Sequence, residues 1–363
     1  MKVLHIGKFC PPAKGGMETF AQDLVRHLNK NGVEAHLFCF DKHTYKNENL
    51  MYFAFKTDGV FFSAPFSLAL VRYFLKVQNN YDIIHIHTPN PLAEVLSFFT
   101  NKPVVIQWQS DIIKQKLFYR FYKPFQQRAL QKASKIICAL QDYLDTSEQL
   151  KEFKDKTAII PLGVDTKRLE DTSFDYKYNS IKDKLKGKKI ILSIGRLVYY
   201  KGFEYLIESA KYLPDDFLIL IIGDGYLFDK LNNMIKSRNL EQRIILLGEV
   251  ENINPFLKNC DIFCLPSIGR AESFGIVLVE ALYYKKPLIT TNVYGSGLTY
   301  INKDNQTGLV VPPKDPKAIA DAIIKILSDK DMYDRFSKAS FERFQEFDIT
   351  NTVNLIVNLY KSI

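Results

Sequence analysis

The sequence between residues 270 and 280 reads Arg270-Ala271-Glu272-Ser273-Phe274-Gly275-Ile276-Val277-Leu278-Val279-Glu280. It follows an apolar run, Asp261 to Pro266, that predicts a buried strand leading into a loop. The residues from Gly275 onward predict the first turn of a helix, whose leading amide groups have no partner within the helix. These amides and the positive end of the helix dipole attract anions, so we expect a phosphate group at this helix start.

Two carboxylates in this stretch lie on either side of the predicted helix start. Glu272 belongs to the loop, and Glu280 lies about a turn and a half into the helix. Glu280 is therefore placed to accept hydrogen bonds from a ribose whose diphosphate rests on the helix start, and Glu272 faces the sugar end. The alternative is a solvated loop acid followed by an ordinary acid on a helix surface.

Two cations follow the first strand of the second half of the chain. The segment reads Ser193-Ile194-Gly195-Arg196-Leu197-Val198-Tyr199-Tyr200-Lys201-Gly202. A diphosphate leaving group gains negative charge as its bond to a sugar breaks, and a guanidinium and an ammonium beside it stabilise that charge. Arg196 and Lys201 are our candidates for this role. The alternative is a pair of surface cations that bound a turn.

The two motifs, in this order and spacing, resemble the retaining glycosyltransferases of family 4. The paired glutamates match the E-x7-E signature of that family, and the resemblance is strongest from Gly195 to Glu280. It implies an α/β protein of the GT-B type, in which two Rossmann-like doubly wound domains face an inter-domain cleft. It also implies that Glu272, with the Ser273, Phe274 and Gly275 backbone, binds the donor sugar, and that Arg196, Lys201 and Glu272 are catalytic.

The pattern of apolar runs supports two domains. A chain of 363 residues fits two domains of about 150 to 200 residues each. Strand-length runs alternate with helical stretches, which predicts two parallel sheets with a ligand cleft at the carboxyl ends of their strands. The predicted strands are Val3–Ile6, Val33–Phe40, Asp82–His87, Pro103–Trp108 and Lys135–Ala139, then Lys189–Ile194, Phe217–Ile222, Arg243–Leu247, Asp261–Leu265, Pro287–Thr291 and Gly308–Val311.

The domain boundary is expected where this alternation lapses, between Pro161 and Gly187. We assign residues 1–165 to an acceptor-side domain and residues 166–349 to a donor-binding domain. The amphipathic segment 350–363 predicts a terminal helix. By the family resemblance, this helix packs back on the first domain.

Glycine-rich turns mark further candidate contacts with the donor. Gly15 and Gly16 precede a helix that starts near Met17, so the backbone there can approach a ligand closely. With Glu18 they resemble the G-G-x-E element of the same family, and we assign Glu18 to the acceptor or sugar side of the site. The spacing is not that of a dinucleotide fingerprint. Two more donor contacts are expected at backbone positions that would select the nucleotide base, Gly223 and Val250.

Two histidines alternate on one predicted strand. His85 and His87 share a face of the strand Asp82–His87. Two such ligands could hold a metal, but no third ligand is evident in the sequence, and the resembling family needs none. We therefore expect no metal and no cofactor, and we expect His87 to contribute to the polarity of the acceptor or sugar site.

One position departs from the family pattern. The segment Gln107-Trp108-Gln109-Ser110-Asp111 carries glutamine where relatives have histidine in W-H-S-D. In those relatives this side chain is thought to contact the donor sugar, so Gln109 and Asp111 are assigned to the sugar side of the site. An amide donates and accepts hydrogen bonds but cannot take up a proton at neutral pH, which weakens any claim that Gln109 is a general base. Three alternatives stay open: an altered donor preference, reduced activity, or a backbone carbonyl in place of the side chain.

The net charge of +9 is concentrated in the first half of the chain. Residues 1–165 hold 21 Lys and Arg against 15 Asp and Glu, and no acid occurs between residues 112 and 141. Basic and aromatic residues interleave over 112–135, which suits an anionic membrane surface presenting a lipid-linked acceptor. The alternative is a helix that packs its aromatic face on the core. No nucleic-acid-binding module is recognisable, so we expect no nucleic-acid partner.

Cysteine usage and hydropathy bear on location. The five cysteines are Cys10, Cys39, Cys138, Cys260 and Cys264, mostly within apolar runs. This usage predicts buried free thiols in a reducing compartment. No run is long and apolar enough to span a membrane. We expect a cytoplasmic protein that associates peripherally with the inner face of the cytoplasmic membrane.

The family resemblance implies an enzyme that moves a hexosyl unit, with retention of anomeric configuration, from a nucleotide diphosphate sugar to a lipid-linked or growing bacterial surface polysaccharide such as O-antigen or exopolysaccharide. GDP-mannose is favoured slightly over UDP-sugars because the segments around Trp108 and Arg196 look like those of mannosyltransferases. Two alternatives remain open: a non-hydrolysing nucleotide-sugar epimerase and a non-catalytic sugar-nucleotide-binding subunit of an assembly complex. The sequence identifies neither acceptor, linkage nor oligomeric state.

Overall fold

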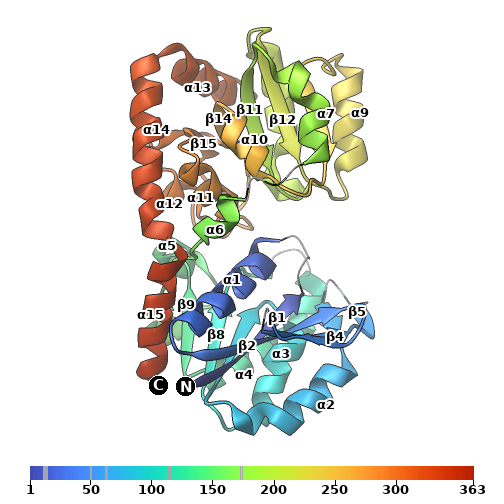
Figure 1. Ribbon diagram of the computed structural model, residues 1–363, viewed down its shortest axis with the longest axis vertical. Helices are drawn as coiled ribbons and strands as arrows, with labels where there is room; N and C mark the ends of the chain where they lie inside the picture. Colours follow the sequence, from blue (N-terminus) through green and yellow to red (C-terminus); the bar gives the residue numbers. More distant parts are fainter. Residues whose placement is uncertain (11–14, 50, 62–63, 113–115, 172, 174) are drawn as a thin grey trace. The chain divides into compact units, whose positions relative to one another are not determined.

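The computed structural model describes residues 1–10, 15–49, 51–61, 64–112, 116–171, 173 and 175–363. The chain forms two compact units. Unit 1 contains residues 1–164 and 348–363, and unit 2 contains residues 165–347 (Figure 1). The terminal helix α15 (Ile349–Lys361) therefore belongs to unit 1. Among the described helices, none combines the length and the apolar composition needed to cross a bilayer.

Unit 1 is built on one sheet with the order β10-β9-β8-β7-β1-β2-β4-β3, and β5 and β6 form a separate pair. Neighbouring strands of the large sheet are parallel except β3, which is antiparallel to β4. The strands are β1 (Lys2–Phe9), β2 (Glu34–Asp41), β3 (Tyr45–Asn47), β4 (Tyr52–Lys56), β5 (Gly59–Phe61), β6 (Ala64–Phe66), β7 (Ile83–Thr88), β8 (Val104–Trp108), β9 (Lys135–Cys138) and β10 (Thr157–Ile159).

Helices connect successive strands of unit 1. Besides α15 they are α1 (Gly16–Lys30), α2 (Leu68–Val77), α3 (Pro91–Leu96), α4 (Lys116–Lys132) and α5 (Gln141–Thr146), with 3₁₀ turns η1 (Gln78–Asn80), η2 (Ser97–Phe99) and η3 (Lys151–Lys156). Helices α1 and α15 pack against each other. Phe20 of α1 and Tyr360 of α15 both reach the ring of a histidine on β7, so these two helices cover the same face of the sheet.

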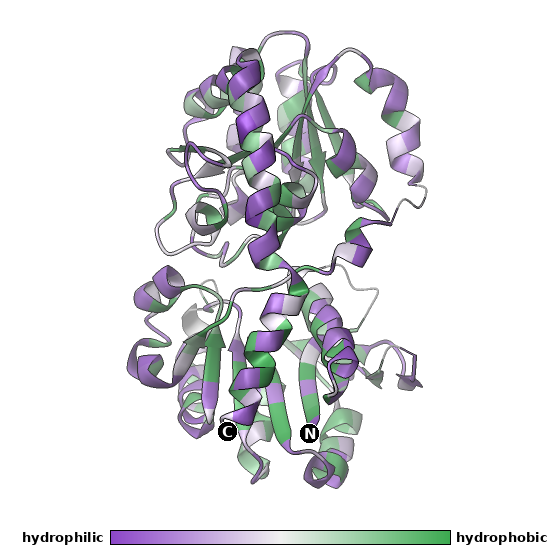
Figure 2. Ribbon diagram, turned by 60° about the vertical axis from the view of Figure 1, so that its left-hand side comes forward, coloured by the Kyte–Doolittle hydropathy of each residue, from purple (hydrophilic) through white to green (hydrophobic). Residues whose placement is uncertain are grey.

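Unit 2 contains a six-stranded, fully parallel sheet with the order β13-β12-β11-β14-β15-β16. Its strands are β11 (Lys189–Ile194), β12 (Phe217–Ile222), β13 (Ile244–Gly248), β14 (Ile262–Leu265), β15 (Leu288–Thr291) and β16 (Gly308–Val311). Parallel strands covered on both faces read as continuous apolar runs, and every residue of β12 is buried. In Figure 2 the strands of each unit are mostly green, whereas purple is concentrated on the helices.

The helices of unit 2 are α6 (Thr166–Leu169), α7 (Tyr176–Leu185), α8 (Phe203–Ser209), α9 (Phe228–Ser237), α10 (Asn254–Asn259), α11 (Ile276–Tyr283), α12 (Leu298–Ile301), α13 (Pro316–Ser328) and α14 (Lys330–Phe344). Short 3₁₀ turns occur at η4 (Tyr199–Lys201), η5 (Ala210–Tyr212) and η6 (Gln345–Phe347). Leu206 of α8 and Ile323 of α13 belong to the core cluster that includes Ile219 of β12.

The eleven strands predicted from apolar runs are all present. The short strands β3, β4, β5, β6 and β10 were not predicted. The prediction that all five cysteines are free thiols was wrong for two of them. Cys10 and Cys39 form a disulfide, because β1 and β2 are adjacent and bring these Cα atoms to 5.1 Å. Cys138, Cys260 and Cys264 are free and buried.

Candidate active site

The centre of the candidate site in unit 2 is an ion pair between Lys201 and Glu272. Lys201 ends the loop after β11, and Glu272 lies in the loop after β14. These two strands are neighbours in the sheet, so the loops at their carboxyl ends meet. Lys201 Nζ lies 2.6 Å from Glu272 Oε2, and each side chain is 9% exposed. The hydroxyl of Ser267 donates a second hydrogen bond to the same oxygen, at 3.0 Å.

Glycines allow this lysine to cross the end of the sheet. A Cβ on Gly195 would lie 3.0 Å from Lys201 Nζ, so the lysine side chain runs directly over that residue. Gly223 follows β12 with φ +138, and a Cβ there would lie 2.0 Å from the carbonyl oxygen of Gly195. Only glycine fits at Gly223, because both the backbone conformation and the space exclude a side chain. Val250, the other predicted base-selecting position, follows β13 and is buried.

Helix α11 begins where the sequence predicted. Gly275 is its N-cap residue and adopts a left-handed conformation with φ +88. Phe274 is buried and Ser273 is half-buried, so the loop before the helix is anchored. A Cβ on Gly297 would lie 2.0 Å from the Phe274 carbonyl oxygen, which shows how closely the neighbouring loop supports this turn. The first amides of α11 have no partner within the helix and can bind an anion.

Glu280 has an ion-pair partner that sequence reasoning missed. Its side chain is 7% exposed, and Oε1 lies 2.8 Å from Arg168 Nη2. Arg168 belongs to α6, which is tied to α11 a second time because the Tyr284 hydroxyl donates to the Leu169 carbonyl. No motif in the sequence marks Arg168. The carboxylate of Glu280 is therefore held in place by a cation within unit 2.

Arg196 is placed differently from Lys201. It lies in the same loop but is exposed to solvent, and its Nη2 donates to the Tyr200 hydroxyl at 3.2 Å. The structure therefore brings Lys201 and Glu272 together, next to the loop that leads into α11. Arg196 remains a solvent-facing guanidinium of that loop. Its role in binding phosphate stays a prediction.

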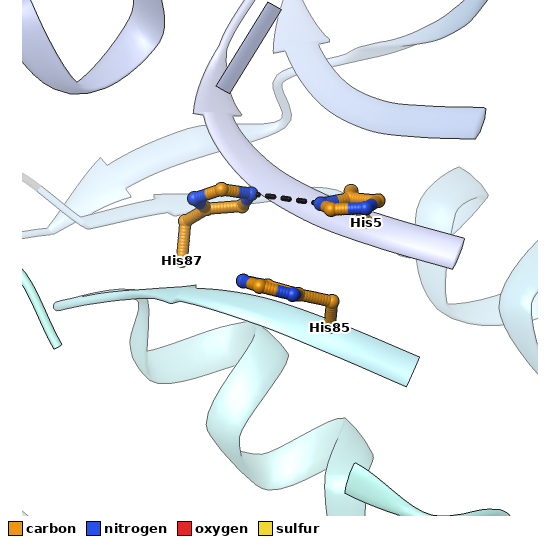
Figure 3. Close-up of side chains that lie close together, drawn as sticks. All are labelled: His5, His85 and His87. Atoms are coloured by element: carbon orange, nitrogen blue, oxygen red, sulfur yellow. Dashed lines mark hydrogen bonds between the residues drawn. The ribbon is translucent and has the colours of Figure 1, made fainter. Parts of the chain in front are cut away.

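The second group of predicted site residues lies in unit 1, where the structure supplies the third histidine that the sequence did not reveal. His5 of β1 is paired in register with His85 of β7. His5, His85 and His87 form a buried cluster whose ligand atoms lie within 4.8 Å of one another (Figure 3). Burial lowers the pKa of His87 to about 3 and holds the pKa values of His5 and His85 well below their usual range, so all three rings are neutral.

The arrangement of the rings bears on whether they bind a metal. His5 Nδ1 and His87 Nε2 are 3.1 Å apart and share a hydrogen bond, so each points at the other. The His85 ring lies below, stacked on both neighbours with centroids at 4.5 and 4.8 Å, so its lone pairs run parallel to theirs. The described rings fit a hydrogen-bonded stack better than a metal site, and the expected independence from metal stays a prediction.

Gln109 and Asp111 follow β8 at the same end of the sheet. Gln109 Nε2 lies 3.4 Å from His87 Nδ1, and its Oε1 is buried with no partner among the described residues. Asp111 is engaged by other protein groups: its Oδ1 accepts from Trp108 Nε1 at 3.0 Å and from the hydroxyl of Ser147, at the end of α5, at 2.7 Å. Its contacts indicate that Asp111 shapes this loop. The Oε1 atom of Gln109, in contrast, can accept a hydrogen bond from a ligand.

The predicted glycine-rich loop of unit 1 is described only in part, because residues 11–14 lie outside the described ranges. Gly15 caps α1, and Gly16 is its first residue. A Cβ on Gly15 would lie 2.3 Å from Glu18 Oε2, so the glutamate side chain folds back over the cap. A side chain at Gly15 would displace the flexible end of the Glu18 side chain.

A buried acid in α3, the helix that follows β7, makes the stability of unit 1 depend on pH. Glu94 of α3 is buried and accepts hydrogen bonds from the Tyr122 hydroxyl and, at 3.2 Å, from the Asn90 amide. Burial raises the pKa of Glu94 from 4.5 to about 7. The folded state therefore binds this proton more tightly than the unfolded state, and the stabilisation is fully present below about pH 4.5 and lost as the pH rises through 7.

We expect Glu94→Gln to raise the free energy of unfolding at pH 8 by up to about 3 kcal/mol, because the amide needs no ionisation in the core. At pH 4.5 the gain should vanish. Urea unfolding at both pH values measures the difference, and Glu148→Gln at an exposed position is the control. An equal effect of Glu94→Gln at the two pH values would contradict the assignment of a raised pKa.

Comparisons with known proteins place this arrangement in context. A model described as Glycosyltransferase Family 4 matches residues 14–168, and one described as Glycosyl transferases group 1 matches residues 177–343. The chain is 30% identical to O-antigen chain mannosyltransferase C of Escherichia coli, over 100% of this chain and 99% of the relative. It is also 30% identical to D-rhamnosyltransferase WbpZ of Pseudomonas aeruginosa, over 89% of this chain and 86% of the relative.

A likeness in fold extends to solved structures. The crystal structure of Anabaena Alr3699/HepE in complex with UDP and glucose matches 100% of both chains with a TM-score of 0.83 at 21% identity. At that identity the likeness shows the fold alone. The predicted fold class, two Rossmann-like α/β domains of the GT-B type, is confirmed.

Proposed function

Because this chain is a glycosyltransferase that belongs to family 4, we propose that it transfers a hexosyl unit from a nucleotide diphosphate sugar to a hydroxyl of a bacterial surface glycan, with retention of anomeric configuration. The observation that carries the proposal is the buried Lys201–Glu272 pair beside the loop into α11. It combines a cation for the leaving phosphate with an acid for the sugar.

Each residue of unit 2 has a distinct part in this proposal. Lys201, with Arg196, neutralises the charge that grows on the departing diphosphate. The amides at the start of α11 bind the same phosphates, and Glu280, fixed by Arg168, accepts from the ribose hydroxyls. Glu272 and the Phe274 and Gly275 backbone hold the donor sugar.

The retaining step that we propose is a substitution on one face of the sugar. The bond from the anomeric carbon to the phosphate oxygen breaks, and a bond to the acceptor oxygen forms. The departing phosphate takes the proton of the acceptor hydroxyl. Glu272 Oε2 accepts from both Lys201 and Ser267, which favours an electrostatic role for this carboxylate over a role as nucleophile.

GDP-mannose is the proposed donor and a lipid-linked or growing O-antigen-type glycan the proposed acceptor, on the strength of the relative named O-antigen chain mannosyltransferase C. Thermal shift against a panel of GDP- and UDP-sugars tests the donor. Transfer assays with the stabilising donor test the acceptor, and NMR of the product anomeric proton reports the configuration of the new bond. An inverted product would contradict retention. Donor conversion without any acceptor would point to an epimerase, and binding without transfer to a non-catalytic subunit.

We further propose that unit 1 meets an anionic membrane surface through α4. Phe121 and Phe125 are one helical turn apart and 72% and 51% exposed. Arg120, Lys123 and Arg128 are exposed on the same helix. Exposed aromatic residues interleaved with cations suit an anionic interface. The start of the predicted segment, residues 113–115, lies outside the described residues.

The variant Phe121→Ser/Phe125→Ser should weaken binding to vesicles containing anionic lipid by about tenfold or more, because two exposed aromatic side chains no longer enter the interface. Co-sedimentation with anionic and neutral vesicles measures the loss. The matched control is Tyr176→Ser/Tyr294→Ser, which removes two aromatics of unit 2 that are at least as exposed. Equal partitioning of the α4 variant and the wild type would exclude this surface.

A further inference from the structure

The buried polar groups of unit 1 form a connected chain that the proposed chemistry does not yet use. It begins at Tyr360 on the terminal helix α15, whose hydroxyl lies 3.4 Å from His5 Nε2. His5 Nδ1 lies 3.1 Å from His87 Nε2, the contact drawn as a dashed line in Figure 3. His87 Nδ1 lies 3.4 Å from Gln109 Nε2. The chain thus runs from the C-terminal helix to the carboxyl end of the sheet.

The link between Gln109 and His87 fixes the direction of all the others. An amide nitrogen only donates, so His87 Nδ1 must accept from Gln109. A neutral imidazole has one donor and one acceptor, so His87 Nε2 carries the proton and donates to His5 Nδ1. By the same logic His5 donates from Nε2 to the Tyr360 oxygen. The Tyr360 proton then goes to His85 Nδ1, 2.5 Å away.

The members of the chain are too deeply buried to exchange these partners for water. His5, His87 and Tyr360 are each at most 2% exposed. A buried donor without its acceptor costs about 1 to 3 kcal/mol, so reversing one link alone is unfavourable. The linked hydrogen bonds therefore behave as a unit in which all of them donate in the same direction.

The consequence appears at Gln109, the last residue of this chain of hydrogen bonds. With its nitrogen committed to His87, the Gln109 amide must present its oxygen on the other side. That oxygen is buried and has no partner in the described part of the chain. An unpaired buried acceptor is costly in the free protein, and a ligand hydroxyl that donates to it recovers the cost.

We propose that Tyr360, His5 and His87 are positioning residues that orient Gln109 so that its Oε1 accepts a hydrogen bond from a sugar hydroxyl. This inference rests on the proposed glycosyl transfer for its ligand, but the orientation of the amide does not depend on it. Position 109 then requires a side chain that donates to His87 and accepts from the sugar. Histidine satisfies both requirements, since its two nitrogens divide the roles, whereas methionine satisfies neither.

The tautomers of the histidines are the direct test. Nitrogen NMR of the histidine-labelled full chain should show His5 and His87 neutral, protonated at Nε2 and bare at Nδ1. A His87 ring protonated at Nδ1 would overturn the proposal. This readout needs no activity, so it stands even if wild-type protein transfers no sugar, a result that would instead overturn the proposed function.

Transfer kinetics supply the second test. We expect Gln109→His to keep turnover within a few fold of the wild type and Gln109→Met to lower it by about tenfold or more, as for a lost hydrogen bond to a reacting sugar. Tyr360→Phe should lower turnover by about tenfold at most, and should have no further effect in the Gln109→Met background. Independent, additive losses would overturn the positioning role, because a purely structural tyrosine would act in both backgrounds.

A matched tyrosine serves as the control. The Tyr81 hydroxyl lies 3.1 Å from His36 Nδ1 in the same unit, and Tyr81 is also buried. This pair is separate from the chain that leads to Gln109. Tyr81→Phe should leave both turnover and the His5 and His87 tautomers unchanged. An equal loss of turnover in Tyr81→Phe and Tyr360→Phe would reduce the effect of Tyr360 to general packing and overturn the proposal.

Discussion

Replacing Lys201 with methionine is expected to lower the turnover of sugar transfer by about a hundredfold or more. The ammonium is preorganised against Glu272, and each of these two side chains is 9% exposed. Removing one such charge stabiliser typically lowers turnover by about two powers of ten. Turnover at saturating donor and acceptor measures the effect. A variant that retains near-normal turnover would remove Lys201 from the mechanism.

The design of this experiment must separate catalysis from stability. Lys201→Met leaves the buried Glu272 carboxylate without its cation, which costs about 3 kcal/mol or more of unfolding free energy. The double variant Lys201→Met/Glu272→Gln removes both charges, and we expect it to regain stability but not turnover. Arg238→Gln, which breaks the exposed pair with Glu208, should change neither.

Replacing Glu280 with glutamine is expected to raise the donor dissociation constant by about ten- to a hundredfold, since hydrogen bonds to a charged acceptor contribute about 1.5 to 3 kcal/mol. Turnover at saturating donor should change less, because the ribose lies away from the breaking bond. Isothermal titration with the donor and with the free nucleoside diphosphate checks this. An unchanged dissociation constant would exclude the ribose role.

Arg168 offers an internal comparison for Glu280. It does not touch the ribose in our proposal but fixes the carboxylate through the 2.8 Å contact. Arg168→Gln should therefore weaken donor binding in the same direction as Glu280→Gln, but by a smaller factor. A larger loss in Arg168→Gln would mean that the guanidinium itself binds the donor.

The sequence predicted those parts of the fold that are written as local patterns. The buried run Phe217–Ile222 is apolar at every position and became β12, as expected of a parallel strand covered on both faces. Strand β10, Thr157–Ile159, was missed because three residues carry too little periodicity. Strand β4, Tyr52–Lys56, was missed although its first four residues, Tyr52–Phe55, form an apolar and aromatic run that is typical of a strand.

In the candidate site too, contacts between residues that are far apart in the sequence could not be predicted. Lys201 and Glu272 were each predicted, but their contact depends on β11 lying next to β14, and strands that are not consecutive give no local signal. His5 was missed for this reason, because β1 meets β7 only in the folded sheet. The disulfide between Cys10 and Cys39 was missed too, because it depends on the pairing of β1 with β2 in the folded sheet.

The placement of α15 has a consequence for the order of events during synthesis. Residues 165–347 form a continuous module inserted into unit 1, and a backbone bridge between Val164 and Asp348 joins the two flanks of the insertion. A ribosome therefore releases every residue of unit 2 before it makes the helix that completes unit 1. Unit 2 can acquire its core on the nascent chain, whereas the His5 stack stays without Tyr360 until α15 has been synthesised.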